Sequence, residues 1–142
     1  SALATLELLS PDAAVRRAAV AELGKASLDE SALPVLERAL AAETDAGTRT
    51  TLARLRASVL VESSDKAKRL AAARELAASS QSAVAGLLQE RLAPGSESDP
   101  EVRAALARAL DDVRGRLAWG ERLGVVFAGV SLGSVLVLVA LG

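Results

Sequence analysis

The chain has 142 residues, and its 17 Lys and Arg side chains nearly balance 18 Asp and Glu side chains. This balance leaves no basic excess for binding nucleic acid and no acidic tail. Because Cys and His are absent, thiolate nucleophiles, imidazole bases, disulfides and the usual zinc sites are excluded, and we expect no enzyme activity, no cofactor and no metal.

Helical periodicity runs through the first 118 residues. Ala and Leu dominate, and apolar residues recur at spacings of three and four, which places each set on one face of a helix. The alternation of apolar and polar residues that is typical of strands is almost absent. The sequence therefore predicts an all-α protein, a right-handed stack of helical hairpins. The expected helices lie near residues 2–9, 12–24, 31–42, 46–61, 65–78, 81–92 and 99–118.

Capping patterns mark where several of these helices begin and end. Ser10-Pro11-Asp12 places a polar cap before a first-turn proline and an acid, Ser64-Asp65 marks another start, and Asp99-Pro100-Glu101 repeats the first pattern. Gly24 suits the C-terminal end of a helix. Residues 94–98 combine Pro, Gly and Ser and form the clearest loop.

An Asp followed four residues later by an Arg recurs along the chain. The first and last intervals between successive aspartates are nearly equal, and the middle interval, from Asp45 to Asp65, is much shorter. Intervals near 30–35 residues are typical of a two-helix repeat, so the short middle interval predicts one abbreviated repeat. We expect ion pairs that align the stack; the alternative is a ladder that binds an anion or a protein partner. The pairs are Asp12 and Arg16, Asp45 and Arg49, Asp65 and Arg69, and Asp99 and Arg103.

Two of these stretches share further residues. In the first, Asp12, Val15 and Arg16 precede Ala18, Ala19 and Leu23-Gly24; in the second, Asp99-Pro100-Glu101-Val102-Arg103 precedes Ala104, Ala105 and Leu110. Both resemble HEAT-like repeats, and Ser31-Ala32-Leu33-Pro34-Val35-Leu36 resembles the second helix of such a unit. The resemblance covers most of residues 10–115 and implies a HEAT-like α-solenoid.

The last twenty residues, Leu123 to Gly142, contain no charged side chain. A helix of this length can cross the hydrocarbon core of a bilayer, which is about 30 Å thick. Trp119 lies four residues earlier and is expected to be an interfacial anchor; the alternative is a place in the core of the last repeat helix. We therefore expect two parts: the solenoid over residues 1–118, and the first transmembrane helix of a longer protein over residues 119–142.

Small residues within the apolar segment are spaced for close packing of helices. Gly129 and Gly133 form a G-x-x-x-G pattern that lets a neighbouring helix approach closely, although glycine is also common in membrane helices in general. Ser131 and Ser134 are expected to hydrogen-bond across helices, or to carbonyl groups of their own helix.

The order of residues in this segment carries a second resemblance. It reads Phe127-Ala128-Gly129-Val130-Ser131-Leu132-Gly133-Ser134, followed by Leu136, Leu138, Ala140, Leu141 and Gly142. It resembles the first membrane helix of bacterial ABC permeases for branched-chain amino acids and urea, whose urea-type members carry a helical, HEAT-like region ahead of that helix. The resemblance implies an accessory or docking domain of a permease that imports urea or short-chain amides. The partners implied are a second permease subunit, ATPase subunits and a periplasmic substrate-binding protein. The family's later signature lies beyond Gly142, so no transport residue is carried over.

The side of the membrane is open to two interpretations. The resemblance implies a bacterial inner-membrane protein whose N-terminal domain is periplasmic, after removal of a signal peptide. However, Arg114, Arg116 and Arg122 flank the N-terminal side of the apolar segment, and positive charge favours the cytoplasmic side. The alternative is therefore a helical-repeat interaction scaffold that faces the cytoplasm and is held by a membrane tail.

Overall fold

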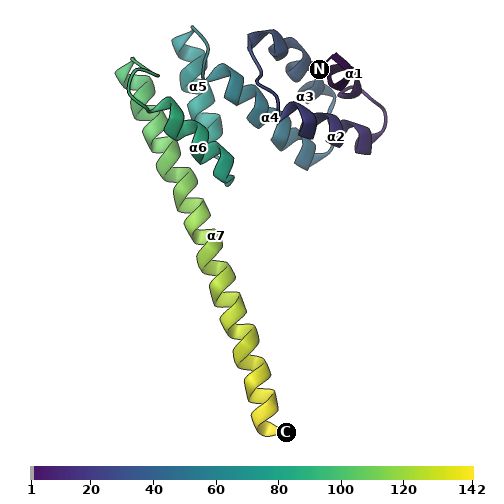
Figure 1. The fold of residues 1–142 in the computed structure, drawn as a ribbon, viewed down its shortest axis with the longest axis vertical. Helices are drawn as coiled ribbons and strands as arrows, with labels where there is room; N and C mark the ends of the chain where they lie inside the picture. The colour runs from purple at the N-terminus through teal and green to yellow at the C-terminus, as the bar shows by residue number, and fades with distance from the viewer. Residues whose placement is uncertain (1) are drawn as a thin grey trace.

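The computed structural model describes residues 2–142, and every regular element among them is a helix (Figure 1). The all-α prediction is confirmed for this part of the chain. The description does not extend to the side chains of Ala2, Phe127, Val130, Ser131, Leu132, Ser134 and Val135.

The described helices follow the predicted order. Apart from the end of the last helix, their bounds lie within two residues of the predicted ones. They are α1 (Ala2–Glu7), α2 (Ala13–Leu23), the 3-10 helix η1 (Glu30–Ala32), α3 (Leu33–Ala42), α4 (Ala46–Leu60), α5 (Lys66–Leu76), α6 (Ser82–Arg91) and α7 (Pro100–Leu141).

Local hydrogen bonds explain most of these boundaries. The N-cap of α2 is Asp12 rather than Ser10, because its carboxylate accepts the N–H of Ala14 at 2.8 Å. Gly24 ends α2 as predicted, and its N–H donates to the carbonyl of Val20 at 3.0 Å. The loop after α6 turns at Gly95, whose φ of 83° is a conformation that favours glycine.

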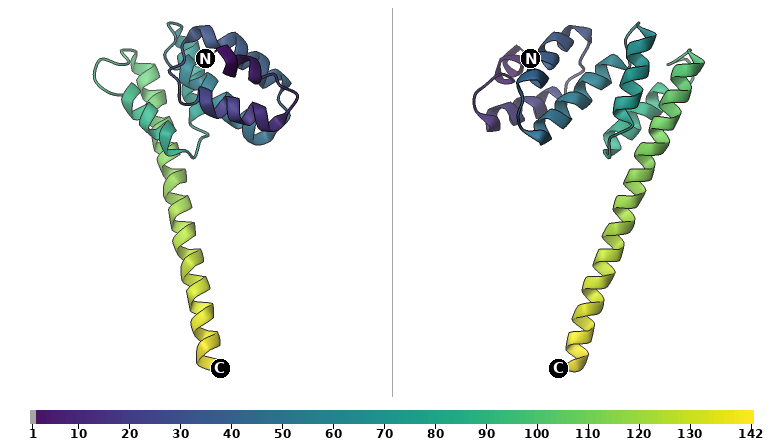
Figure 2. Two further views of the ribbon diagram at one scale, coloured as in Figure 1. Left: turned by 45° about the vertical axis from the view of Figure 1, so that its right-hand side comes forward. Right: turned by 180° about the vertical axis from the view of Figure 1, so that it is seen from behind.

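The buried apolar side chains form two clusters, and α4 contributes to both of them. Leu52, Leu55 and Val59 pack into the first cluster with side chains of α1, α2 and α3. Ala57 and Val61 pack into the second cluster with α5, α6 and the first part of α7. Figure 1 and Figure 2 show α4 between these two groups of helices. Because α4 is shared, the two clusters belong to one continuous body.

The contacts between helices occur twice in the same order. α2 and α3 both pack on α4, and α5 and α6 both pack on α7. We call α2, α3 and α4 the first three-helix unit, and α5, α6 and the first part of α7 the second. Equivalent positions in the two units are related by a nearly constant offset in the sequence: Leu23 matches Leu76, Leu52 matches Leu106, and all four side chains are buried. The short interval in the Asp–Arg series therefore separates the third helix of one unit from the first helix of the next. This three-helix period differs from the predicted two-helix repeat with one abbreviated copy.

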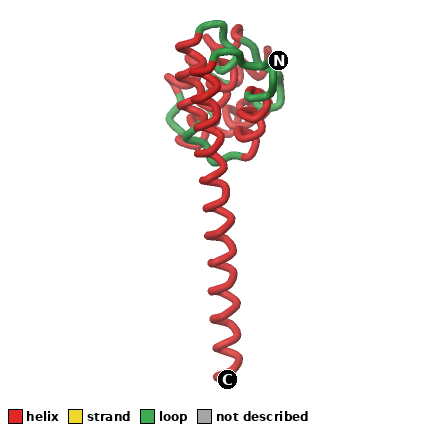
Figure 3. The backbone as a smooth tube through the Cα atoms, turned by 90° about the vertical axis from the view of Figure 1, so that its left-hand side faces the viewer, coloured by secondary structure: helices red, strands yellow, loops and turns green. Residues whose placement is uncertain are grey.

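The last helix, α7, runs for 42 residues, which corresponds to about 63 Å at about 1.5 Å per residue. Among the described side chains, Leu117 is the furthest along α7 that packs against the second cluster. The predicted end near residue 118 is wrong: no proline follows Pro100, and single glycines such as Gly120 cost a helix only about 1 kcal/mol each. The rest of α7 projects away from the helical body (Figure 2; Figure 3).

Candidate functional site: two arginine–glutamate junctions and the exposed end of α7

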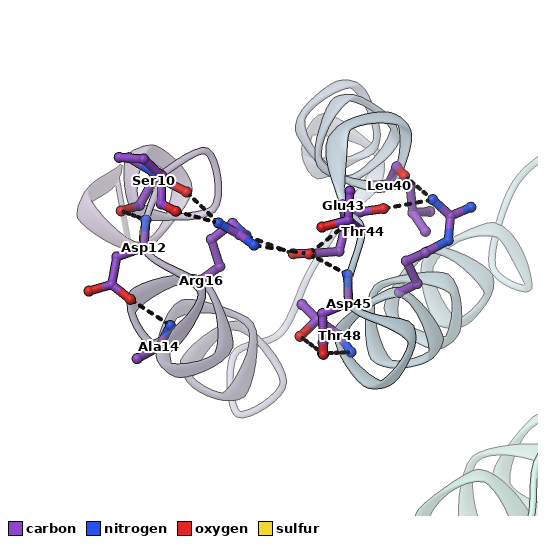
Figure 4. Close-up of polar contacts among 11 residues, drawn as sticks. Ser10, Asp12, Ala14, Arg16, Leu40, Glu43, Thr44, Asp45 and Thr48 are labelled. Carbon is purple, nitrogen blue, oxygen red and sulfur yellow. Dashed lines mark hydrogen bonds and ion pairs between the residues drawn. The ribbon is translucent and has the colours of Figure 1, made fainter.

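All four aspartates of the predicted pairs lie at the N-cap of a helix. Each carboxylate accepts an N–H group from the first turn, which satisfies a donor that has no partner within the helix and places negative charge at the positive end of the helix dipole. Figure 4 shows the first two caps. The bonds run to Asp12 from Ala14 at 2.8 Å, to Asp45 from Thr48 at 2.9 Å, to Asp65 from Ala67 at 2.9 Å, and to Asp99 from Glu101 at 2.9 Å.

The four arginines reach backward along the chain. Each Nη1 donates to the carbonyl oxygen six residues earlier, in the loop before its own helix: Arg16 to Ser10 at 2.8 Å, Arg49 to Glu43 at 3.0 Å, Arg69 to Ser63 at 2.9 Å, and Arg103 to Glu97 at 2.9 Å. Within the described structure, no ion pair joins the Asp and the Arg of the same pair. The expectation of Asp–Arg ion pairs is therefore wrong, because each guanidinium is turned back to a loop carbonyl while the aspartate caps its helix.

Instead, Arg16 binds a buried glutamate that lies far away in the sequence. Glu43 is 5% exposed, and Arg16 donates to it twice, from Nε at 2.9 Å and from Nη2 at 3.2 Å (Figure 4). The backbone N–H groups of Thr44 and Asp45 also donate to Glu43, both at 2.9 Å. This two-pronged charged contact ties the start of α2 to the loop between α3 and α4.

A second junction repeats this arrangement in the second unit. Glu97 is 5% exposed, and its Oε2 lies 2.9 Å from Nε of Arg69 and 3.9 Å from Nη2 of Arg91. Its Oε1 accepts the N–H of Asp99 at 3.1 Å. Nε of Arg69 is close enough for an ion pair but makes no aligned hydrogen bond, so this junction is looser than the one at Glu43.

The sequence analysis missed both glutamates. Each stands two residues before an N-cap aspartate, in Glu43-Thr44-Asp45 of the first unit and in Glu97-Ser98-Asp99 of the second. A Glu-x-Asp pattern that recurs ahead of two helices is the signal that would have singled them out.

Hydrogen bonding sets the charge state of the first junction. The Arg16 guanidinium, followed by the N–H of Asp45, lowers the pKa of Glu43. The hydroxyl of Thr48, followed by its N–H, lowers the pKa of Asp45. Both side chains are therefore carboxylates at neutral pH and act as acceptors rather than as proton donors.

The two junctions hold helices together and leave little for external chemistry. The arginines of the supposed anion-binding ladder are engaged by carbonyl groups, and two of them also by glutamates. Across the described residues, no three His, Cys, Asp or Glu side chains gather where they could hold a metal ion. The geometry is that of internal ties between the first helix of each unit and the loop that leads into its third helix.

In the far part of α7, large apolar side chains among the described ones are exposed rather than packed against the helical body. Trp119 is 64% exposed, so the alternative that places it in the core is wrong. Further exposed side chains along α7 are Leu123, Val125, Val126, Leu136, Val137, Leu138, Val139 and Leu141, with exposed fractions between 58% and 81%. Within the part of the chain that the structure describes, no helix is both long enough and apolar enough to cross a membrane.

Two of the predicted packing positions can be placed on α7. Gly129 and Gly133 both lie within the helix, and a Cβ atom added to either one would meet nothing within 4 Å. Both positions are thus open to an approaching surface. The other two, Ser131 and Ser134, lie outside the described side chains.

No known protein family, curated protein or solved structure matches this chain.

Proposed function

We propose that this chain is a non-catalytic docking domain, an α-solenoid that its last helix attaches to a membrane. The observation that carries the proposal is the continuity of α7, which begins in the core of the helical body and ends in a charge-free segment. Apolar side chains that are more than half exposed need a non-aqueous environment or a partner. The spanning role rests on the sequence of residues 123–142, which includes side chains beyond the described ones.

The solenoid assignment is supported by the repetition of contacts. Two three-helix units share α4 at their boundary, and the same arginine, glutamate and aspartate positions recur in both. Stacked repeats offer an extended surface that suits a protein partner. A docking role is therefore the function that best fits a helical body whose charged junctions are engaged internally.

In its finer form, the proposal makes this chain the N-terminal region of a urea-type ABC permease subunit in the bacterial inner membrane, with the solenoid on the periplasmic side. This rests on the resemblance of Phe127–Ser134 to the first helix of such permeases, and on the helical region that precedes it. The substrate-binding protein or the second permease subunit is the natural partner of the solenoid.

Deleting residues 1–112 from the full-length protein, with any signal sequence and the membrane part retained, tests the docking role. We expect urea uptake to weaken or the complex to fail to assemble, while the ATPase subunits keep their activity. Normal uptake and assembly without the domain would contradict a required docking role.

The second candidate is a cytoplasmic scaffold with a membrane tail, and the observation in its favour is the position of Arg114, Arg116 and Arg122. Trypsin distinguishes the two sides, because Lys25 lies in an exposed loop and its side chain is 72% exposed. A periplasmic domain is cut at Lys25 in intact spheroplasts. A cytoplasmic domain is cut only after lysis.

A further inference from the structure

The short helix α1 occupies the place that the end of α4 occupies one unit later. Ala4 matches Ala57 and Leu8 matches Val61, with the same separation in the sequence, and all four side chains are buried. α1 packs on α2, as α4 packs on α5. The loops that follow also match, since Oγ of Ser10 and Oγ of Ser63 each accept an N–H two residues later at 3.2 Å.

One matching position differs sharply in exposure. Val59 is 4% exposed and lies in the first cluster, where Leu23 of α2 and Leu36 of α3 also lie. Leu6 matches Val59 at the same separation in the sequence and is 74% exposed. The two positions have the same chemistry, so the difference lies in what covers them.

We infer that the Leu6 face of α1 is a stacking surface for a further repeat unit of the same construction. α2 and α3 cover the matching face of α4, so the equivalent pair of helices in an additional tandem unit would cover Leu6. A second copy of this chain offers no free pair of that kind, because Leu23 and Leu36 are already buried in its own core.

The positions on either side of Leu6 show which contacts matter. Leu3 is 67% exposed and matches Arg56, whereas Leu9 is 44% exposed and matches Glu62. One unit later, the positions that match Leu3 and Leu9 thus hold charged side chains, whereas the position that matches Leu6 holds a buried valine. Leu6 is therefore the centre of the stacking surface, and Leu3 and Leu9 lie at its margin.

A tandem chimera tests the inference in the full chain, held in detergent micelles because of its apolar end. Residues 10–55 are placed directly ahead of Leu3, so that α1 becomes the continuation of a complete third helix. Hydrogen exchange at the α1 amides is then measured by mass spectrometry. We expect exchange to slow at least about tenfold relative to the parent chain.

Three matched variants of the chimera sharpen the result. Leu6→Asp is expected to restore fast exchange in α1, whereas Leu3→Arg and Leu9→Glu are expected to leave it slow. A chimera with one extra residue at the junction rotates Leu6 by about 100° away from the added unit and should lose the protection.

Several outcomes would overturn the inference. One is an exchange rate at the α1 amides that is the same in both registers of the added unit. Another is a Leu6→Asp effect on that rate no larger than the effects of the two controls. A parent chain that forms dimers, and that Leu6→Asp makes monomeric, would assign the surface to a second copy instead.

Discussion

Nε of Arg16 lies 2.9 Å from Oε2 of Glu43, and this ion pair has a counterpart between Arg69 and Glu97 in the second unit. In each unit, an arginine near the start of the first helix reaches the loop that leads into the third helix. Such an ion pair holds the unit together, because it joins the first helix to the start of the third, which the second helix separates in the sequence.

Replacing Glu43 with Gln should destabilise the helical body. The amide would put an NH2 group or a weaker neutral acceptor against the Arg16 guanidinium, and the loss of hydrogen bonds to a charged group should lower the free energy of unfolding by about 1.5–3 kcal/mol. Urea unfolding of the full chain in detergent, followed by circular dichroism, measures the effect. The control is Glu37→Gln at an exposed position of α3, which should be nearly neutral. Equal effects of the two substitutions would contradict the role of Glu43.

The matching substitution Glu97→Gln should cost less than Glu43→Gln. Arg69 is near Glu97 but lacks the aligned Nε hydrogen bond that Arg16 makes. The same urea experiment gives the comparison. Because the closest nitrogen–oxygen distance is 2.9 Å in both junctions, an equal or larger loss at Glu97 would contradict the view that hydrogen-bond alignment sets the strength of the junction.

Stability should fall in acid. The folded state lowers the pKa of Glu43 below its ordinary value of 4.5, so the unfolded chain takes up the proton first as the pH falls. The stabilisation is therefore fully present above pH 4.5 and is lost as the pH falls through the lowered pKa. Urea midpoints compared between neutral pH and about pH 3 should show this decline. The urea midpoint of Glu43→Gln should decline less between these two pH values than that of Glu37→Gln. An identical decline in the two variants would exclude Glu43 as a source of the acid sensitivity.

Truncating a leucine in either cluster should weaken the whole body. Leu36 and Leu88 are 1% and 0% exposed, and removing such a side chain typically costs about 2–5 kcal/mol. Because α4 contributes to both clusters, we expect Leu36→Ala and Leu88→Ala each to shift one cooperative transition. Two separate transitions, with each variant moving only its own, would show that the clusters unfold independently.

A charge placed near the middle of the apolar segment should oppose membrane insertion. Gly133→Arg is expected to cost about 2.5–3.5 kcal/mol in an insertion assay with a reporter fused to residues 114–142. Gly133→Leu at the same position is the control and should insert at least as well as the unchanged segment. Equal insertion of the arginine variant would mean that residues 123–142 do not span the bilayer.

The sequence by itself determined the helices and most of their ends. Apolar spacing of three and four fixes which face of a helix is buried, and an aspartate that caps a helix bonds to an N–H only two or three residues away. These are local relationships, so Asp45, Asp65 and Asp99 could be placed at helix starts from their neighbours alone. The apolar character of residues 123–142 is likewise a property of the sequence.

Only the tertiary structure decided which side chains meet across the units. Glu43 and Glu97 are each far along the chain from the arginine that they bind, Arg16 or Arg69, so each pair forms only when the first and third helices of a unit pack together. The three-helix period also emerges only from the tertiary structure, because it is defined by which helices are in contact and not by the spacing of Asp and Arg. The continuity of α7 past residue 118 also required the structure. The sequence changes there from charged to apolar, but this change does not break the backbone hydrogen bonds of the helix.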